Sequence, residues 1–563
     1  MFRRSGEYTE PDIFTGTSQL LNSRKLKFYE SDLQWHNVFY KEITSSINEE
    51  IFKVLYPSRT GRPNSPIRIL VAMQILKEGF NWSDEQLFHE SRFNLLVMRA
   101  LGLTNINDEI PVPSTYYDFR AKLTAHQQQT GEDLFTQAFY DLTRLQAKTY
   151  NVNGSKIRMD SKLISSNIAS CTRLQLTIGM LQKFFKTLDK RQKGKILKKH
   201  LIKLEELMEK DAQAHVFPLS NKEKTLWLKN LGKVYRYLLQ RFSDDDSSEY
   251  DNLSRLYEEQ YRESDDQQEV TLTPSQEISG NTMQSPHDPE ATYRRKDNGQ
   301  KKQRIKGYVA NITETCDDQP LNLISDIITK TVITPDDYFF QPAIQNSEQV
   351  TGQITEVWTD GAYNSVDNYN FTQLPNSPIK WHLNALQGEK GFYEFWWKKE
   401  HLMVKDLRTG QTQKAIKTPK GKYRINDTPG NKSRYRYFNS TTIENYFRRL
   451  EIEAQPVEVK NKRANVESTV HHAFYHLKGS KTKYRGLIKN HIFNISRAIW
   501  VNFKRIQAFL SNYWPKKLIS EILLEIQNLR MKKMTKFSIQ LLNFGLLMHF
   551  PKNRRMQLTK FIA

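Results

Sequence analysis

Two predicted strands each end in an aspartate, and a predicted helix much further along the chain carries a glutamate. The strands are contained in Lys156-Ile-Arg-Met-Asp160 and Val357-Trp-Thr-Asp360, and the glutamate closes Arg463-Ala-Asn-Val-Glu467. Carboxylates brought together from two strands and a helix form an oxygen-rich pocket, which hard cations such as Mg²⁺ prefer. Such a pocket suits phosphodiester chemistry, because the cations keep positions open for water and phosphate. The order of these acids therefore indicates an α/β fold in which all three meet.

The charge of the chain indicates the kind of partner. Lysine and arginine number 84 and aspartate and glutamate 62, which gives a formal net charge of +22 over 563 residues. An excess of this size favours a polyanion, most commonly nucleic acid. On charge alone, a basic but otherwise ordinary soluble protein is the alternative.

Cysteine content and hydropathy limit the other classes. Two cysteines, Cys171 and Cys316, exclude a disulfide framework and a cysteine-based zinc site, and they fit a reducing cytoplasm. The N-terminus lacks the apolar core of a signal peptide. The longest apolar run, residues 537–550, is interrupted by polar residues and is too short to span a bilayer. We therefore expect a cytoplasmic protein without a membrane partner.

Residues 1–147 read as an N-terminal helical domain that binds DNA. Apolar residues at helical spacing follow the Gly61-Arg-Pro63 break, and Ser83-Asp-Glu-Gln86 is a capping-box pattern that opens a further helix. Short helices separated by tight breaks are typical of a helix-turn-helix DNA reader, which we favour. The alternative is a helical bundle that only packs on the rest of the chain.

The remaining sequence reads as an α/β core that two insertions interrupt. Apolar runs at residues 305–313 and 321–333 predict a hairpin. The lysine-rich face of the first insertion is more often a solvated surface than a DNA groove. The predicted segments, in order, are the first part of the core at 148–170, a helical insertion at 171–264, a linker at 265–300, the second part of the core at 301–372, a β-rich insertion at 373–430, core helices with Glu467 at 431–510, and a basic helical C-terminus at 511–563.

Three motifs around the acids resemble those of DDE transposases from bacterial insertion sequences. Arg158-Met-Asp160 and the residues up to Asn167 resemble the first-aspartate motif, and Asp360-Gly-Ala-Tyr363 resembles the second. Arg463-Ala-Asn-Val-Glu467 is similar to the glutamate helix, in which an arginine precedes the glutamate by four positions. The order strand, hairpin, helix, strand and helix is that of an RNase-H-like core.

Other segments extend this resemblance. Residues 285–296 and 307–311 are similar to the superfamily of the four, five and eleven-eighty-two type elements, and closest to the eleven-eighty-two type. The segment near residues 60–125 resembles the N-terminal domain of the same group. The resemblance covers most of residues 50–510, and its specificity comes from the order of the motifs, since each motif alone is weak.

The resemblance implies an RNase-H-like catalytic core, a mixed five-stranded sheet with helices. Asp160, Asp360 and Glu467 would be both catalytic residues and metal ligands for two Mg²⁺ ions, for which Mn²⁺ can substitute. Asp160 would bridge both ions, with Asp360 on one and Glu467 on the other. The enzyme would cleave the inverted-repeat ends of its own element and join the freed 3′-OH to target DNA. Because two ends must meet, we expect a homodimer or a larger synaptic complex, associated with the nucleoid.

The glutamate helix departs from the pattern of some relatives, which carry tyrosine, arginine, glutamate and lysine at fixed spacing. This chain has Lys460 at the tyrosine position and Phe474 at the lysine position, with Lys478 as a substitute cation one helical turn later. Arg463 would share a helical face with Glu467 and could pair with a phosphate through two hydrogen bonds. A salt bridge from Arg463 to an aspartate is an equally good alternative.

Basic residues near aromatic ones complete the predicted DNA surface, although solvated helix ends are the ordinary interpretation of such residues. The chain beyond residue 478 is rich in lysine and arginine, which predicts phosphate contacts and a steep dependence of binding on salt. The residues predicted to contact DNA are Arg463, Lys478, Tyr363, Arg485, Lys504 and Arg505.

Two other functions stay open at this point. One is an RNase-H-like nuclease that cuts DNA without joining it, and the other is a transposase-derived DNA-binding protein with an inert pocket. A further acid, Asp288, could add a fourth carboxylate to the site, but we favour a role in anchoring its loop.

Overall fold

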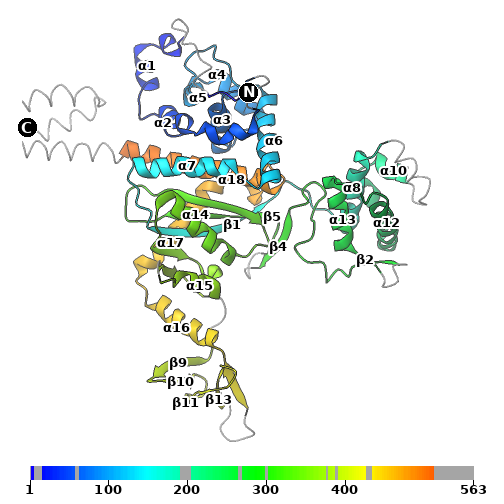
Figure 1. Cartoon of the computed structure of the whole chain (residues 1–563), viewed down its shortest axis with the longest axis vertical. Helices are drawn as coiled ribbons and strands as arrows, with labels where there is room; N and C mark the ends of the chain where they lie inside the picture. The colour runs from blue at the N-terminus through cyan, green and yellow to red at the C-terminus, as the bar shows by residue number, and fades with distance from the viewer. Residues whose placement is uncertain are drawn as a thin grey trace, which may run out of the picture.

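The computed structural model describes residues 2–4, 16–57, 63–189, 204–263, 269–297, 302–375, 378–386, 391–426 and 434–512. Within these residues, helices of the N-terminal domain cover one side of a mixed sheet, a helical insertion projects sideways, and a β-rich insertion extends from the opposite end (Figure 1). The predicted basic C-terminus and the apolar run at 537–550 lie outside the described residues, apart from residues 511 and 512. In the part described, no helix has both the length and the apolar character that crossing a bilayer requires.

The N-terminal domain is helical, as predicted. Ser83 and Gln86 form the expected capping box, with the Ser83 hydroxyl accepting from the Gln86 N–H at 3.1 Å. Its third helix is buried on nearly all sides, which is typical of a core helix rather than a surface reader. The helices are α1 (Ser23–Tyr29), α2 (Trp35–Glu42), α3 (Ile67–Phe80), α4 (Asp84–Phe93), α5 (Leu95–Ala100), α6 (Pro113–Thr130) and α7 (Leu134–Thr149).

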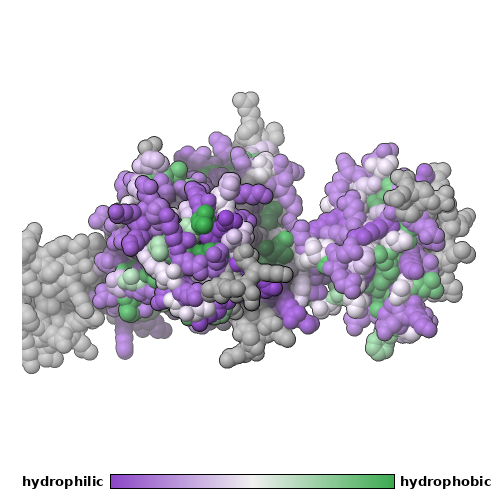
Figure 2. All heavy atoms as spheres, turned by 90° about the horizontal axis from the view of Figure 1, so that it is seen from below, coloured by the Kyte–Doolittle hydropathy of each residue, from purple (hydrophilic) through white to green (hydrophobic). Residues whose placement is uncertain are grey.

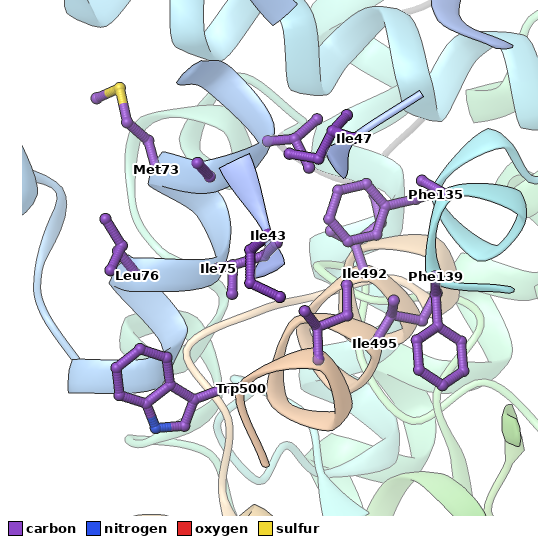
Figure 3. Close-up of a cluster of buried hydrophobic side chains, with 14 of the residues drawn as sticks. Ile43, Ile47, Met73, Ile75, Leu76, Phe135, Phe139, Ile492, Ile495 and Trp500 are labelled. Carbon is purple, nitrogen blue, oxygen red and sulfur yellow. The ribbon is translucent and has the colours of Figure 1, made fainter. Parts of the chain in front are cut away.

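This domain shares one hydrophobic core with the long helix α18 (Leu487–Asn512). Figure 3 shows side chains of α3, α7 and α18 meeting in that core, among them Leu76, Phe139 and Trp500. Gly79 of α3 lies against the indole of Trp500, and a Cβ at position 79 would lie 2.3 Å from that ring. The N-terminal domain is therefore packed closely on a helix of the core.

A mixed sheet with helices forms the centre of the molecule, which confirms the predicted α/β class. Its main path is β6–β5–β1–β7–β8, in which β1 is antiparallel to β5 and parallel to β7. The sheet has six strands and not five, because β4 pairs with the first half of β5. The strands are β1 (Lys156–Ser165), β4 (Thr292–Asp297), β5 (Lys302–Thr315), β6 (Ile324–Thr331), β7 (Glu356–Thr359) and β8 (Lys380–Leu383).

Helices cover both faces of the sheet. Ile157 and Met159 of β1 pack in one cluster with α14 (Phe340–Thr351), which follows the short turn η5 (Asp336–Phe339). Because neighbouring side chains of a strand point to opposite faces, Arg158 and Asp160 lie on the other face. That face carries α17 (Val457–Phe474) and α18. The alternation along β1 therefore turns Asp160 toward the helix that carries Glu467.

Two strands of the central sheet lie where the sequence suggested other structure. β4 falls in the segment predicted as a linker, and β8 falls in the segment predicted as the β-rich insertion, yet both pair within the central sheet. β8 extends the sheet by parallel pairing with β7. The predicted hairpin at 305–333 is present as β5 and β6.

The two insertions have hydrophobic cores of their own. Seen from below, the helical insertion is a separate lobe beside the body, and the surface on this side is largely hydrophilic (Figure 2). The helical insertion contains α8 (Arg173–Thr187), α10 (Leu204–Glu209), α11 (Ala212–Val216), α12 (Asn221–Arg241), α13 (Ser248–Gln260), β2 (Tyr261–Glu263) and β3 (Val270–Leu272). The β-rich insertion, framed by α15 (Val366–Thr372) and α16 (Ser440–Ala454), contains β9 (Tyr393–Lys398), β10 (His401–Asp406), β11 (Thr412–Lys414), β12 (Ile416–Lys417), β13 (Tyr423–Asn426) and β14 (Tyr435–Phe438).

Candidate active site

Asp160 lies in the middle of β1, opposite Ile312 of β5, and not at the end of its strand as predicted, because pairing with β5 continues to Ser165. Its side chain is 17% exposed, and its Oδ1 accepts a hydrogen bond from the backbone N–H of Ser161 at 3.0 Å. Pairing with β5 continues on both sides of Asp160, whereas pairing with β7 ends at Arg158, so the carboxylate projects from a paired strand toward α17.

Asp360 follows β7, the strand that runs parallel to β1. It caps the short turn η6 (Gly361–Tyr363), where its Oδ1 accepts from the Ala362 N–H at 2.9 Å. A Cβ on Gly361 would lie 2.1 Å from the carbonyl oxygen of Ala385, so the chain can turn here only with glycine. The Asp360 side chain is 36% exposed.

Glu467 and Arg463 lie one turn apart on α17, as their spacing predicted. The Arg463 Nη1 donates to Glu467 Oε1 at 2.9 Å, and the Glu467 side chain is 58% exposed. Glu467 is thus the most accessible of the three acids, whereas the Arg463 side chain is only 13% exposed.

A buried carboxylate holds α17 on the sheet. Glu314 of β5 accepts from Arg158 Nε at 2.6 Å, from Arg505 Nη2 at 2.6 Å, and from the hydroxyl of Thr469 on α17 at 2.7 Å. Burial would raise the pKa of Glu314, but the Arg505 and Arg158 guanidinium groups hold it below its ordinary value. Arg158 also donates to the carbonyl oxygen of Lys462 at 2.8 Å. This network therefore fixes the helix immediately beside Arg463.

The three predicted acids converge on a single guanidinium. Arg463 Nη2 lies 3.4 Å from Asp160 Oδ1 and 3.8 Å from Asp360 Oδ2, and its Nη1 contacts Glu467 as described above. The Nε of Arg463 is buried and has no hydrogen-bond partner among the described residues. The structure thus brings together the residues that the sequence singled out, and it contains the salt bridge that was the alternative for Arg463.

Burial, with a smaller contribution from neighbouring carboxylates, raises the pKa of both aspartates. Burial raises the pKa of Asp160 to about 6, with Arg463 acting against the rise and the charge of Asp360 adding to it. Burial likewise raises the pKa of Asp360, opposed by the hydrogen bond from Ala362 and the charge of Arg463. One cation does not fully compensate these carboxylates, so the site favours additional positive charge.

The chemistry of the donors fits a hard divalent cation, because the three acids offer only oxygen. In the described part of the chain, however, no group of three or more His, Cys, Asp or Glu side chains is drawn close enough to hold a metal ion. The Arg463 guanidinium lies among the three carboxylates and pairs with each of them.

Asp336 is a further acid near the site that the sequence reasoning missed. It lies at the start of η5, its Oδ1 accepts from the Ser161 hydroxyl at 2.7 Å, and its charge contributes to the raised pKa of Asp360. An acid in the first turn of a helix is an ordinary helix-start residue, so its position in the sequence carried no functional signal.

Tyr363 does not face the solvent, contrary to its predicted contact with DNA. Its ring is fully buried in the cluster between the sheet and α14, and its hydroxyl donates to Asn311 Oδ1 at 2.5 Å. Asn311 lies opposite Ser161 in the β1–β5 pair. Tyr363 therefore supports the strand that carries Asp160.

The other predicted DNA contacts are spread over the molecule. Arg505 is bound to Glu314, so its guanidinium has a structural role. Lys478, Arg485 and Lys504 are exposed, and the last two donate to the Asn167 carbonyl oxygen at 2.7 Å and to Gln507 at 2.9 Å. Within the described residues, none of these cations makes an ion pair with the three acids.

Asp288 anchors its loop, as favoured from the sequence. Its side chain is buried, its Oδ1 accepts from the Tyr308 hydroxyl at 2.6 Å, and its Oδ2 accepts from the Ser166 hydroxyl. These bonds join the segment before β4 to β1 and β5. Asp288 is therefore not a fourth member of the carboxylate group.

Comparison with known proteins supports a transposase. Residues 28–122, most of the N-terminal helical domain, match the family described as Transposase domain (DUF772). No curated protein matches the sequence. A solved structure, the piggyBac transposase synaptic complex with hairpin DNA, is similar at 10% identity and a TM-score of 0.27, over 86% of this chain and 77% of that chain. A TM-score of this size supports no statement about the fold.

Proposed function

We propose that the chain is a DDE transposase with an RNase-H-like core, which cleaves the ends of its own insertion sequence and joins the 3′-OH to target DNA. The observation that carries this proposal is the approach of Asp160, Asp360 and Glu467 to one guanidinium. The strand order β6–β5–β1–β7–β8, with three antiparallel strands followed by two parallel ones, is consistent with such a core. The match to a transposase domain supports the same class.

The three carboxylates would hold Mg²⁺, or Mn²⁺ in its place. Cations of this kind activate the attacking oxygen and stabilise the leaving oxygen in phosphoryl transfer. Asp160 lies on β1 and Asp360 directly follows the adjacent strand β7, so the sheet keeps their backbones close together. Glu467 sits on a helix that Glu314 ties to the same sheet, which gives the third ligand an equally fixed base.

Arg463 would change partners when DNA binds. In the DNA-free protein it partly neutralises the carboxylates. Its planar guanidinium can instead pair with a phosphate by two parallel hydrogen bonds, which are charge-assisted and strong. Departure of Arg463 toward DNA would then leave the carboxylates free for metal, so that the site assembles only on its substrate.

The partners follow from this reaction. The enzyme would bind the inverted-repeat ends of the element and a target duplex, in accord with its net charge of +22. Because two ends are joined to one target, a dimer or a larger complex would hold both. Because both of its partners are DNA, we propose that the protein associates with the nucleoid.

The test uses the DNA that flanks the gene, since the sequence of the ends is expected there. The full chain is incubated with a linear duplex containing one end, a supercoiled target plasmid and Mg²⁺, and the products are resolved on a denaturing gel. We expect cleaved ends and end–target joints, neither of which forms in EDTA. Cleavage without joints would overturn the proposal in favour of a nuclease, and binding without cleavage in favour of an inert DNA-binding protein.

A further inference from the structure

A two-stranded ribbon extends beyond the central sheet. β1 pairs with β5 only from Gly307 onward and β6 only from Tyr308 onward, so residues 302–306 of β5 pair with β4 alone. In Figure 1 these two strands leave the sheet on the side of the helical insertion. We call β4 together with residues 302–306 the β4–β5 ribbon.

Cations lie on both faces of the β4–β5 ribbon, and one face carries three of them side by side. Arg295 lies directly opposite Arg304, and Tyr293 lies directly opposite Lys306. Residues directly opposite each other in an antiparallel pair share a face, and so do residues two apart along a strand. Arg295, Arg304 and Lys306 are therefore neighbours, and the two arginines are exposed. The opposite face carries Arg294 and Lys296 together with Ile305, which is buried.

Two of these cations have no acidic partner in the described part of the chain. Arg304 and Lys306 make no ion pair there through their side chains. Lys296, on the opposite face of the ribbon, is near enough to Asp360 for its charge to act against the rise in the pKa of that carboxyl.

We propose that the β4–β5 ribbon binds the phosphate backbone of the duplex whose scissile bond enters the carboxylate site. This inference rests on the proposed function and adds the element that positions its substrate. A two-stranded ribbon has dimensions that a DNA groove accepts. Arginine and lysine without a carboxylate partner suit phosphates, and contacts of that kind set the position of a protein on DNA without reading its sequence. The ribbon would therefore bind all sequences alike.

The test measures binding by the full chain without cleavage, in EDTA. The variant Arg304→Ala/Lys306→Ala is titrated with a fluorescent linear duplex at several salt concentrations. Loss of two phosphate contacts should weaken binding roughly tenfold and reduce the slope of log K against log salt by about 2. The charge-preserving variant Arg304→Lys/Lys306→Arg should restore both values. As a matched control, Lys229→Ala/Lys233→Ala removes two exposed lysines of α12 and should bind like wild type.

Three outcomes separate this inference from the proposed function. The ribbon proposal is overturned if the Arg304→Ala/Lys306→Ala variant unfolds like wild type and binds DNA with unchanged affinity and salt slope. The exposed cations of the ribbon would then serve an acidic protein partner and not DNA. Full cleavage by Asp160→Ala would overturn the proposed function, whatever the ribbon does. If both proposals hold, the ribbon variant cleaves DNA with a raised KM and an unchanged kcat, whereas Asp160→Ala binds DNA normally and does not cleave it.

Discussion

Arg463 of α17 lies 3.4 Å from Asp160 of β1, Nη2 to Oδ1, although both insertions separate the two residues in the sequence. The same guanidinium also reaches Asp360 and Glu467. It carries one positive charge among three carboxylates. Arg463 therefore sets the electrostatics of the site, and in the proposed function it would compete with the metal for the same carboxylates.

Replacing Arg463 should separate metal binding from catalysis. In Arg463→Gln, the repulsion between the guanidinium and a divalent ion is gone, so Mn²⁺ affinity without DNA should rise about tenfold, which corresponds to about 1.4 kcal/mol. Strand cleavage should fall, because the phosphate contact is lost. Mn²⁺ titration followed by electron paramagnetic resonance measures the first effect. Weaker Mn²⁺ binding in this variant would show that Arg463 supports the metal site and does not compete with it.

Glu314 should be essential for the stability of the core. Glu314→Gln leaves the buried Arg158 and the partly exposed Arg505 without a full counter-charge, which costs roughly 3–5 kcal/mol. The apparent unfolding temperature measures this loss. Glu50→Gln breaks the exposed pair with Arg4 and serves as the control, with an expected change under about 1 kcal/mol. Equal effects of the two substitutions would contradict the structural role of Glu314.

The contact of Asp133, at the start of α7, with His491 of α18 should make the free energy of unfolding depend on pH. Burial alone would raise the pKa of Asp133, but the hydrogen bond and charge of His491 and the Thr136 N–H hold it at about 2, below the ordinary 3.8. The ionised carboxylate thus contributes about 2 kcal/mol above pH 3.8, and this contribution is lost as pH falls through 2. Asp133→Asn should be less stable than wild type at pH 7, and about half of that difference should remain at pH 3. A difference that does not change between these two pH values would exclude the ionised pair as its source.

Docking of the N-terminal domain should depend on Gly79. The Cβ of Gly79→Ala would overlap the Trp500 ring, so we expect a loss of about 1–3 kcal/mol despite the better helix propensity of alanine. Gly79→Ala/Trp500→Leu makes room for the methyl group and should recover part of that loss. Gly391→Ala, where a Cβ meets no atom within 4 Å, is the control and should be nearly neutral. The measurement is the thermal unfolding temperature of wild type, of the two Gly79 variants and of Gly391→Ala.

The sequence pattern predicted the central sheet, the hairpin and the meeting of the three acids, because each signal was local. A strand end, a turn and an i, i+4 pair are each readable within a few residues. The place of β8 was not readable, since four residues close to an aromatic, β-rich stretch give no sign that they pair with distant β7. The same holds for β4, whose polar sequence resembles a linker.

Side-chain roles were harder to predict than strand positions. A tyrosine such as Tyr363 serves equally well on a DNA surface or in a core with its hydroxyl paired, and only the packing of α14 decides. Arg505 was likewise predicted to contact phosphate, but in the structure its guanidinium pairs with Glu314. The charge pattern of the sequence does not show which cations form ion pairs within the protein and which remain available to bind phosphate.

The measurement that bears most directly on the account is Mg²⁺-dependent strand cleavage by Asp160→Ala, Asp360→Ala and Glu467→Ala, with duplex binding recorded for the same samples. If the three side chains act together on a metal, each substitution removes several kcal/mol of transition-state stabilisation. Cleavage should then fall on the order of a thousandfold in all three variants, while the affinity for DNA stays within about twofold of wild type. Wild-type cleavage by any one of them would contradict the account.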